Sequence, residues 1–187
     1  LTNVHFHESV AEHINLSFYM KDNSKEISIE FNRHRLGIAT SQKSSRYTIE
    51  KLVNAWIDFK NDESTFSGVI YYNIVKESIV HEDEVLVKNT ADYIYAMLDR
   101  YNEDETLKKD LKGGAKKKQN DRVKRSLPES WMLEGVWTFN LRALKHFLKL
   151  RDSGSAYYGI SELANAIKEQ IPHKYRILID KKYCKTL

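Results

Sequence analysis

Apolar and polar residues follow patterns that separate strands from helices along this chain. Within residues 5–19, Ile14, Leu16 and Phe18 lie at every second position, which predicts a strand with one buried face. Thr48 can cap a helix that follows it. The apolar face of that predicted helix consists of Leu52, Val53, Trp56 and Phe59.

Two further helices are predicted in the second half of the chain. A long helix is expected over residues 90–111, with an apolar side formed by Ala91, Ile94, Met97, Leu98 and Tyr101. A shorter helix is expected over residues 140–151, with a buried stripe of Leu141, Leu144 and Leu148. Residues 66–74 and 79–87 show no clear hydrophobic period. The apolar stripes of the predicted helices are typical of a hydrophobic core rather than of a cofactor site.

Residues 24–33 fit two structures. Ile27, Ile29 and Phe31 alternate with polar residues, as in a strand. In contrast, Asn23 can cap a helix that has Glu26 at its third position. The pattern alone therefore leaves strand and helix open.

Composition indicates a globular protein with one domain. The chain has 187 residues, of which 41% are hydrophobic and 30% charged, so it can bury a sizeable core. Its net charge of +4 is compatible with a phosphorylated ligand. The single Cys184 excludes an internal disulfide framework and favours a reducing, cytoplasmic location. No apolar run approaches the roughly 18 residues of a membrane span, so we expect no membrane partner.

Residues 33–47 form the densest group of candidate ligand-binding side chains. They contain four cations, a histidine and a row of hydroxyl and amide side chains. Arginine offers five N–H donors in a planar fork that suits phosphate or carboxylate. The stretch therefore predicts an anion pocket, with a solvated basic loop as the alternative.

The helix expected over residues 140–151 carries a second set. Arg142 and His146 form an i, i+4 pair, while Asn140, Phe147 and Arg151 share another edge. Donors at both ends of one helix suit an elongated ligand. The alternative is a plain amphipathic helix with a solvated basic face.

Two other stretches suggest chemistry that we do not favour. Residues 108–125 join a glycine pair to a run of cations, which is compatible with nucleic-acid binding. No aromatic residue is interleaved there for base stacking, so we expect a mobile loop at residues 112–120 and no nucleic-acid partner. Histidine and glutamate cluster in residues 7–13, but the spacing does not fit a zinc-protease helix, and we expect no metal.

The order of residues 33–47 resembles a motif of the flavin-dependent thymidylate synthases, RHRxxSxxxxSxRY. The matching residues are Arg33, His34, Arg35, Ser44, Arg46 and Tyr47. One extra residue lies between Arg35 and Ser44, and Ala39 stands where the family has its middle serine.

Two more blocks resemble that family in the same order. Residues 7–13 are similar to its H-E-[ST]-x-x-E-H stretch. Leu127-Pro128 precedes a helix similar to the family's Asn-x-Arg…Phe-Leu-x-Leu-Arg, matched by Asn140, Arg142, Phe147, Leu148, Leu150 and Arg151. The resemblance also favours a helix over residues 24–33, and it implies that the family's N-terminal strand and helix are missing.

This resemblance implies a fold and an activity. The fold would be a single α+β domain, an antiparallel β-sheet flanked by helices, assembled as a homotetramer with FAD between chains. The activity would be methylation of dUMP to dTMP, with methylenetetrahydrofolate as carbon donor and NADPH as reductant. No cysteine nucleophile is needed in this family.

The resemblance also implies roles for individual residues. FAD would be contacted by Ser9, Arg33, His34, Arg35, Gln42, Asn140, Arg142 and His146. dUMP would be contacted by Glu30, Lys43, Ser44, Arg46, Lys124 and Arg151. Among these, Arg151 would be catalytic, because a fixed guanidinium stabilises charge that develops on the uracil ring.

Several positions depart from the family pattern. Lys124 replaces an arginine, Lys43 and Glu30 replace other polar residues, and residues 155–161 differ from the family's His-Ala-Gln-x-Glu-Ile-Arg stretch. These departures leave two alternatives. The chain could be a divergent relative with a different one-carbon outcome or an inactive paralogue, or a basic nucleic-acid-binding module.

Overall fold

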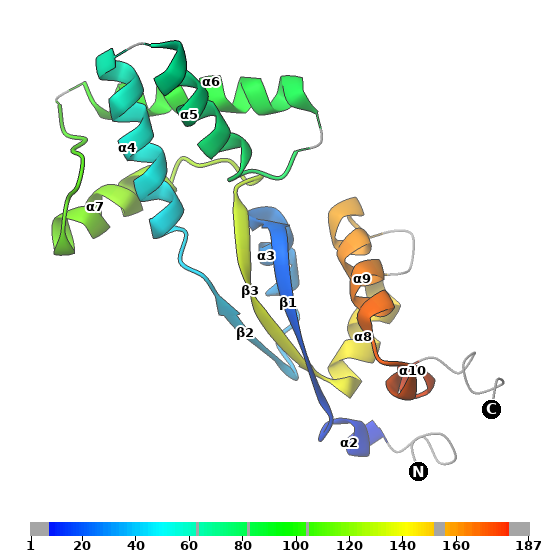
Figure 1. Ribbon diagram of the computed structural model, residues 1–187. Coiled ribbons are helices and arrows are strands. Elements are labelled where there is room, and N and C mark those ends of the chain that lie inside the picture. The colour runs from blue at the N-terminus through cyan, green and yellow to red at the C-terminus, as the bar shows by residue number, and fades with distance from the viewer. Residues whose placement is uncertain (1–7, 63, 82, 104, 152–155, 180–187) are drawn as a thin grey trace. The chain divides into compact units, whose positions relative to one another are not determined.

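The computed structural model describes residues 8–62, 64–81, 83–103, 105–151 and 156–179 (Figure 1). These residues group into two compact units. The sheet unit comprises the described residues of 8–21, 26–42 and 134–179, and the helical unit comprises those of 22–25 and 43–133. Each unit has its own hydrophobic core and is described by itself.

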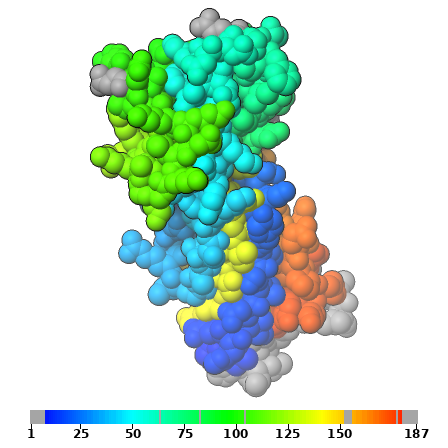
Figure 2. All heavy atoms as spheres, turned by 60° about the vertical axis from the view of Figure 1, so that its left-hand side comes forward, coloured from blue at the N-terminus to red at the C-terminus, as the bar shows by residue number. Residues whose placement is uncertain are grey.

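The sheet has three strands in the order β1-β3-β2. They are β1 (Asn15–Ser24), β2 (Ile38–Gln42) and β3 (Met132–Asn140). β2 runs antiparallel to β3, with Ile38 opposite Phe139 and Gln42 opposite Gly135. Figure 2 shows β3, in yellow, between the residues of β1 and β2. Gly135 permits this pairing, because a Cβ there would lie 2.4 Å from the backbone oxygen of Ser41.

Five helices of the described chain belong wholly or mainly to the sheet unit. They are α2 (Glu8–Ala11), α3 (Lys25–Phe31), α8 (Leu141–Arg151), α9 (Tyr158–Gln170) and α10 (His173–Ile179). α8 packs against α2, α9 and α10. Aromatic rings form the centre of the core, where Phe31 lies 5.2 Å from Phe139 and 5.0 Å from Phe147 between ring centroids. Because Phe31 is the last residue of α3, this packing fixes where the chain leaves that helix.

The helical unit contains α4 (Arg46–Asp62), α5 (Thr65–Lys76), α6 (Glu84–Tyr101) and α7 (Gly113–Lys124). α4 packs against each of the other three. Asp83 caps α6 by accepting hydrogen bonds from the backbone N–H groups of Val85 and Leu86 at 2.7 and 3.2 Å. Ser64 caps α5 in the same way through Ser67.

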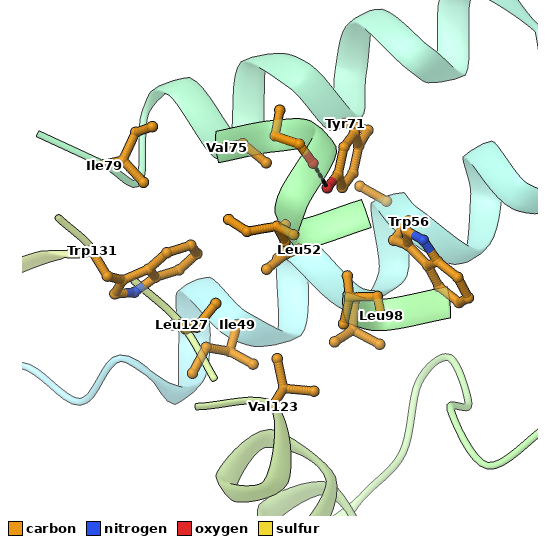
Figure 3. Close-up of a cluster of buried hydrophobic side chains, with 14 of the residues drawn as sticks. Ile49, Leu52, Trp56, Tyr71, Val75, Ile79, Leu98, Val123, Leu127 and Trp131 are labelled. Carbon is orange, nitrogen blue, oxygen red and sulfur yellow. Dashed lines mark hydrogen bonds between the residues drawn. The ribbon is translucent and has the colours of Figure 1, made fainter. Parts of the chain in front are cut away.

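The core of the helical unit is formed by side chains from all four helices (Figure 3). Leu52 and Trp56 of α4 meet Leu98 of α6, and Val123 anchors α7. Tyr71 is also buried, and its hydroxyl donates to the carbonyl oxygen of Ala91 at 2.9 Å. Burial raises the pKa of the Tyr71 hydroxyl, so this polar group stays neutral within an apolar core.

Several predictions, some from the pattern of residues and some from the family resemblance, are confirmed. α3 establishes the helical interpretation of residues 24–33, and α8 coincides with the helix expected over residues 140–151. The expected α+β architecture with a small antiparallel sheet is also confirmed. The single domain stays a prediction. In the part of the chain that the structure describes, no helix has the length and apolar character needed to cross a bilayer.

Other predictions were wrong in position or type. The mobile loop expected at residues 112–120 is the helix α7, because lysine favours helices and the buried Val123 anchors this one. The strand expected over residues 5–19 begins only at Asn15, after α2. α4 begins at Arg46 rather than after Thr48.

The boundaries of α6 were also wrong. It starts six residues before the predicted residue 90, at Glu84, and ends at Tyr101. The cap supplied by Asp83 explains the early start.

Candidate functional site

The arginine-rich turn connects α3 to β2 in the sheet unit. The helix closes with hydrogen bonds from Asn32 N–H to the Ser28 oxygen at 3.0 Å and from His34 N–H to the Phe31 oxygen at 3.0 Å. Phe31 is fully buried, whereas Arg33 and Arg35 are exposed. The buried Phe31 therefore fixes the start of the turn, while the turn's arginines face solvent.

Gly37 brings this turn against the start of α8. Its φ of +71° belongs to the left-handed region, and a Cβ there would lie 2.4 Å from the side-chain nitrogen of Asn140. The backbone N–H of Asn140 donates to the Gly37 oxygen at 2.8 Å. The Asn140 side-chain oxygen accepts from the Ala143 N–H at 2.8 Å, which caps α8. Asn140 is therefore held by both its backbone and its side chain.

A cavity of about 770 Å³ opens beside this contact, within the sheet unit. It is lined by Glu8, Glu12, Leu36, Gly37, Asn140, Arg142, Ala143, Lys145, His146 and Lys149. Three of these residues, Asn140, Arg142 and His146, belong to the set predicted to contact FAD. The first turns of α8 thus bring an amide, a guanidinium and an imidazole to one hollow.

Carboxylates from α2 and the residue beyond it meet the cations of α8. Arg142 forms ion pairs with Glu12 and with Glu8, the latter at 3.6 Å. Lys145 donates to Glu8 at 2.8 Å. This hydrogen bond and the charge of Lys145 lower the pKa of the Glu8 carboxyl below its usual value. The pairs are partly exposed, so they orient Arg142 more than they stabilise the fold.

The other end of α8 carries Arg151, which contacts the arginine-rich turn. Its Nε and Nη2 lie 3.2 and 2.9 Å from Nε2 of His34. Nη2 also lies 3.7 Å from Oε2 of Glu30, whose other oxygen, Oε1, accepts from Nη1 of Arg33 at 2.8 Å. The side chain of Arg151 is only 17% exposed. The structure thus brings together four of the predicted site residues.

The predicted phosphate contacts lie in the helical unit, around the start of α4. Nε and Nη2 of Arg46 donate to the two carboxylate oxygens of Asp121 in α7, both at 3.0 Å. The Asn120 side chain donates to the Arg46 carbonyl oxygen at 3.0 Å. The Ser44 hydroxyl accepts weakly from the Arg46 N–H at 3.4 Å. α7 therefore holds both the backbone and the guanidinium of Arg46.

The remaining predicted residues are scattered. Ser9 lies on α2 but does not line the cavity described above. Gln42 ends β2, and its amide donates to the Ser28 hydroxyl at 2.6 Å. Lys43 and Lys124 are exposed residues of the helical unit.

Some residues at these sites were missed by the sequence reasoning. Glu8, Glu12 and Lys145 line the cavity, and Asn120 and Asp121 hold Arg46. A signal existed for the first group, since Glu8 and Glu12 are four residues apart and Arg142 and Lys145 are three apart, which places each pair on one helix face. No local pattern links Asp121 to Arg46, which lies 75 residues away.

The two disfavoured stretches can also be placed. Within the described residues, no group of histidine, cysteine and acidic side chains could hold a metal ion, and His7 lies outside them. The basic run forms α7, in which Lys116 pairs with Glu50 and Arg122 lies over the Tyr101 ring. Part of that charge is therefore used inside the helical unit.

Comparison with known proteins places this chain in a family. The family model described as thymidylate synthase complementing protein matches residues 2–175. The flavin-dependent thymidylate synthase of Wolinella succinogenes is 34% identical over 172 residues, which cover 92% of this chain and 74% of the relative. That of Campylobacter jejuni is 32% identical over 174 residues, which cover 93% and 73%.

A solved structure is similar as well. The flavin-dependent thymidylate synthase of Helicobacter pylori, complexed with FAD and dUMP, superposes with a TM-score of 0.67. It is 25% identical in sequence, and the match covers 96% of this chain and 78% of that one. Sequence and fold thus point to the same family.

Proposed function

The chain belongs to the flavin-dependent thymidylate synthase family, and from this membership we propose that it methylates dUMP to dTMP with FAD as its cofactor. The observation that carries the proposal is the arrangement along α8, where Asn140 and Arg142 line a cavity and Arg151 is held at the other end. The similar Helicobacter pylori enzyme has been solved with FAD and dUMP.

The residues around the cavity fit a flavin nucleotide. Arg142, Lys145 and Lys149 supply positive charge for a pyrophosphate, and the Asn140 amide supplies a donor for a carbonyl oxygen. Leu36 and Ala143 add apolar lining. Glu8 and Glu12 already pair with Arg142, so we propose that a bound pyrophosphate competes with these carboxylates for the guanidinium.

Arg151 is the proposed catalytic residue. When bound, reduced flavin would supply the hydride and methylenetetrahydrofolate the carbon. The guanidinium of Arg151 would lie against the uracil ring and stabilise negative charge on a ring oxygen or on N3. Its low exposure strengthens that interaction, because water screens charge less inside a protein.

Arg46 and Ser44 are proposed to bind the phosphate of dUMP, with Lys124 and Lys43 as further cations. Nε and one hydrogen of Nη2 are directed at Asp121, which leaves the opposite end of the guanidinium fork for a phosphate. Asp121 would therefore orient Arg46 without occupying all of its donors. Glu30 is proposed to act on the nucleotide from the sheet unit, beside Arg151.

The other expected participants stay proposals. Methylenetetrahydrofolate and NADPH are proposed as co-substrates and a homotetramer as the active assembly, on the strength of family membership. The cytoplasmic location is proposed because thymidylate synthesis draws on nucleotide and folate pools there.

The proposal is tested by following one reaction in the parent and in two arginine variants. We expect purified protein supplied with FAD to show the absorption of bound flavin. After anaerobic reduction, it should form dTMP from dUMP and methylenetetrahydrofolate while the flavin is reoxidised. Arg151→Lys keeps the charge but loses the planar fork, so we expect FAD to stay bound and turnover to fall about a hundredfold.

Arg100→Lys is the matched control, because Arg100 is an exposed residue of the helical unit that pairs with Glu103. It should keep the parent rate. A parent that binds FAD but forms no dTMP would contradict the proposed reaction. An Arg151→Lys variant at the parent rate would contradict only the role of Arg151.

A further inference from the structure

His34 and Arg151 are joined through a single ring nitrogen. Nε and Nη2 of Arg151 lie 3.2 and 2.9 Å from Nε2 of His34, across 117 positions of sequence. Arginine has only donors, so Nε2 must accept both N–H groups. An accepting Nε2 carries no proton, and the neutral ring therefore carries its proton on Nδ1.

The His34 ring is held in place by aromatic neighbours. Its centroid lies 5.1 Å from that of Phe147 at an interplanar angle of 82°, and 6.4 Å from that of Phe31. Both phenylalanines are fully buried in the core of the sheet unit. The acceptor for Arg151 thus rests on a rigid support rather than on a mobile loop.

We propose that His34, as the neutral Nδ1–H tautomer, is a positioning residue that holds the guanidinium of Arg151 at the pyrimidine, assisted by the carboxylate of Glu30. This inference rests on the proposed function for the identity of the substrate. Glu30 lies 3.7 Å from Nη2 of Arg151, so its carboxylate adds a charge contact at the same nitrogen that contacts His34.

Among the residues that the structure describes, none forms a hydrogen bond to the Nη1 end of Arg151. Of its five N–H groups, Nε–H and one on Nη2 point to His34. The edge formed by Nε and Nη2 faces His34, while the adjacent edge formed by Nη1 and the second N–H of Nη2 can present donors to a ligand.

The inference predicts a dependence on pH. Burial, followed by the charges of Arg151, His146 and Arg33, lowers the pKa of His34 below its ordinary value of 6.5, and Glu30 opposes them. Above 6.5 the ring is neutral and accepts from Arg151. As the pH falls through the lowered pKa, Nε2 gains a proton, the acceptor is lost and two cations face each other. His34 therefore holds the guanidinium of Arg151 above pH 6.5, and this contact is lost as the pH falls through the lowered pKa of His34.

The first test needs no substrate. In the FAD-bound protein with ¹⁵N-labelled histidine, long-range ¹H–¹⁵N spectra should identify His34 as the Nδ1–H tautomer, titrating below 6.5. The Nε–H signal of Arg151 should be resolved in the parent and in His34→Gln, whose amide oxygen can replace Nε2 as acceptor. In His34→Leu, which offers no acceptor, the Nε–H signal of Arg151 should be averaged and no longer resolved. An Nε2–H tautomer, or a signal unaffected by His34→Leu, would overturn the inference.

The second test measures turnover against pH. We expect His34→Leu to lower kcat about ten- to a hundredfold with little change in KM for dUMP, because the guanidinium is misplaced rather than removed. His34→Gln should restore most of kcat and remove the acid limb of the parent profile, since an amide does not titrate. His81→Gln is the matched control on an exposed histidine and should keep the parent profile.

The outcomes separate this inference from the proposed function. A parent without dTMP synthesis but with the expected tautomer and Arg151 signals would refute the reaction and support the positioning. An active parent in which His34→Gln keeps the acid limb, or in which His34→Leu keeps kcat, would refute the positioning and leave the reaction intact.

Discussion

At the scale of single residues, the two arginines proposed to bind dUMP each have a hydrogen-bond acceptor on one edge of the guanidinium. Arg151 rests on His34, and Arg46 rests on Asp121. Both arginines are bound through Nε and Nη2, which leaves the far edge of the fork for a ligand. An arginine is suited to this use because its planar group can be oriented and still donate.

Arg46 provides a prediction about the nucleotide. Arg46→Ala should weaken dUMP binding about ten- to a hundredfold while flavin content stays nearly unchanged, because a charge-assisted contact to phosphate is lost. Asp121→Asn keeps one acceptor for Arg46 and should weaken binding less. The measurement is a titration of the flavin spectrum with dUMP, and equal affinities in Arg46→Ala and parent would remove Arg46 from the phosphate site.

At the scale of elements, α8 sets the distance between the two halves of the predicted chemistry. Asn140 caps its first turn and Arg151 is its last residue. Eleven residues of α-helix span about 16 Å, which is a rigid separation. The cavity is lined along α8 from Asn140 to Lys149, and the Arg151 contact lies at the last residue of that helix, so one helix carries both the proposed flavin contacts and the proposed pyrimidine contact.

The caps of the helical unit give a prediction about stability. Asp83→Ala removes the side chain that accepts from two backbone N–H groups of α6, and it should lower the free energy of unfolding by about 1 kcal/mol. Lys112→Ala is the matched control, because Lys112 precedes α7 without a side-chain cap bond. Denaturant unfolding followed by circular dichroism measures both. Equal losses in the two variants would contradict the capping role of Asp83.

At the scale of the whole molecule, the predicted contacts divide between the two units. All residues expected to bind FAD belong to the sheet unit, as do Glu30 and Arg151. The residues expected to bind the phosphate, Ser44, Arg46, Lys43 and Lys124, belong to the helical unit. We propose that in the homotetramer a neighbouring chain supplies the phosphate contacts, as the family resemblance implies.

This division predicts complementation between two impaired variants. Arg46→Ala damages the helical unit and Arg142→Ala the sheet unit, and each alone should turn over slowly when dUMP is kept well below the Kd of Arg46→Ala. In randomly mixed oligomers, about a quarter of the sites should receive both intact units and regain activity. Dissociating and reassembling the two proteins together, followed by the dTMP assay, measures this. Activity no higher than the mean of the separate variants would contradict a shared site.

The sequence alone indicated candidate residues for the site because binding and catalysis constrain residue type and local order. The Arg-His-Arg triplet and the Asn-x-Arg helix are each local, and a helix presents its side chains at a known spacing. Local periodicity identified α8, whereas for α3 it left strand and helix open and the family resemblance favoured the helix. Patterns within one element are determined by backbone geometry, so they can be read without the fold.

Sequence reasoning failed where an element is stabilised by distant contacts. α7 was expected to be a loop, and its burial of Asn120 and Val123 against the rest of the helical unit could not be seen locally. The pairing of Asp121 with Arg46 and that of His34 with Arg151 span 75 and 117 positions. Residue types and local spacing thus determined which chemistry this chain carries. Only tertiary packing decided which group holds each arginine, because that depends on which side chains the core brings within hydrogen-bond distance.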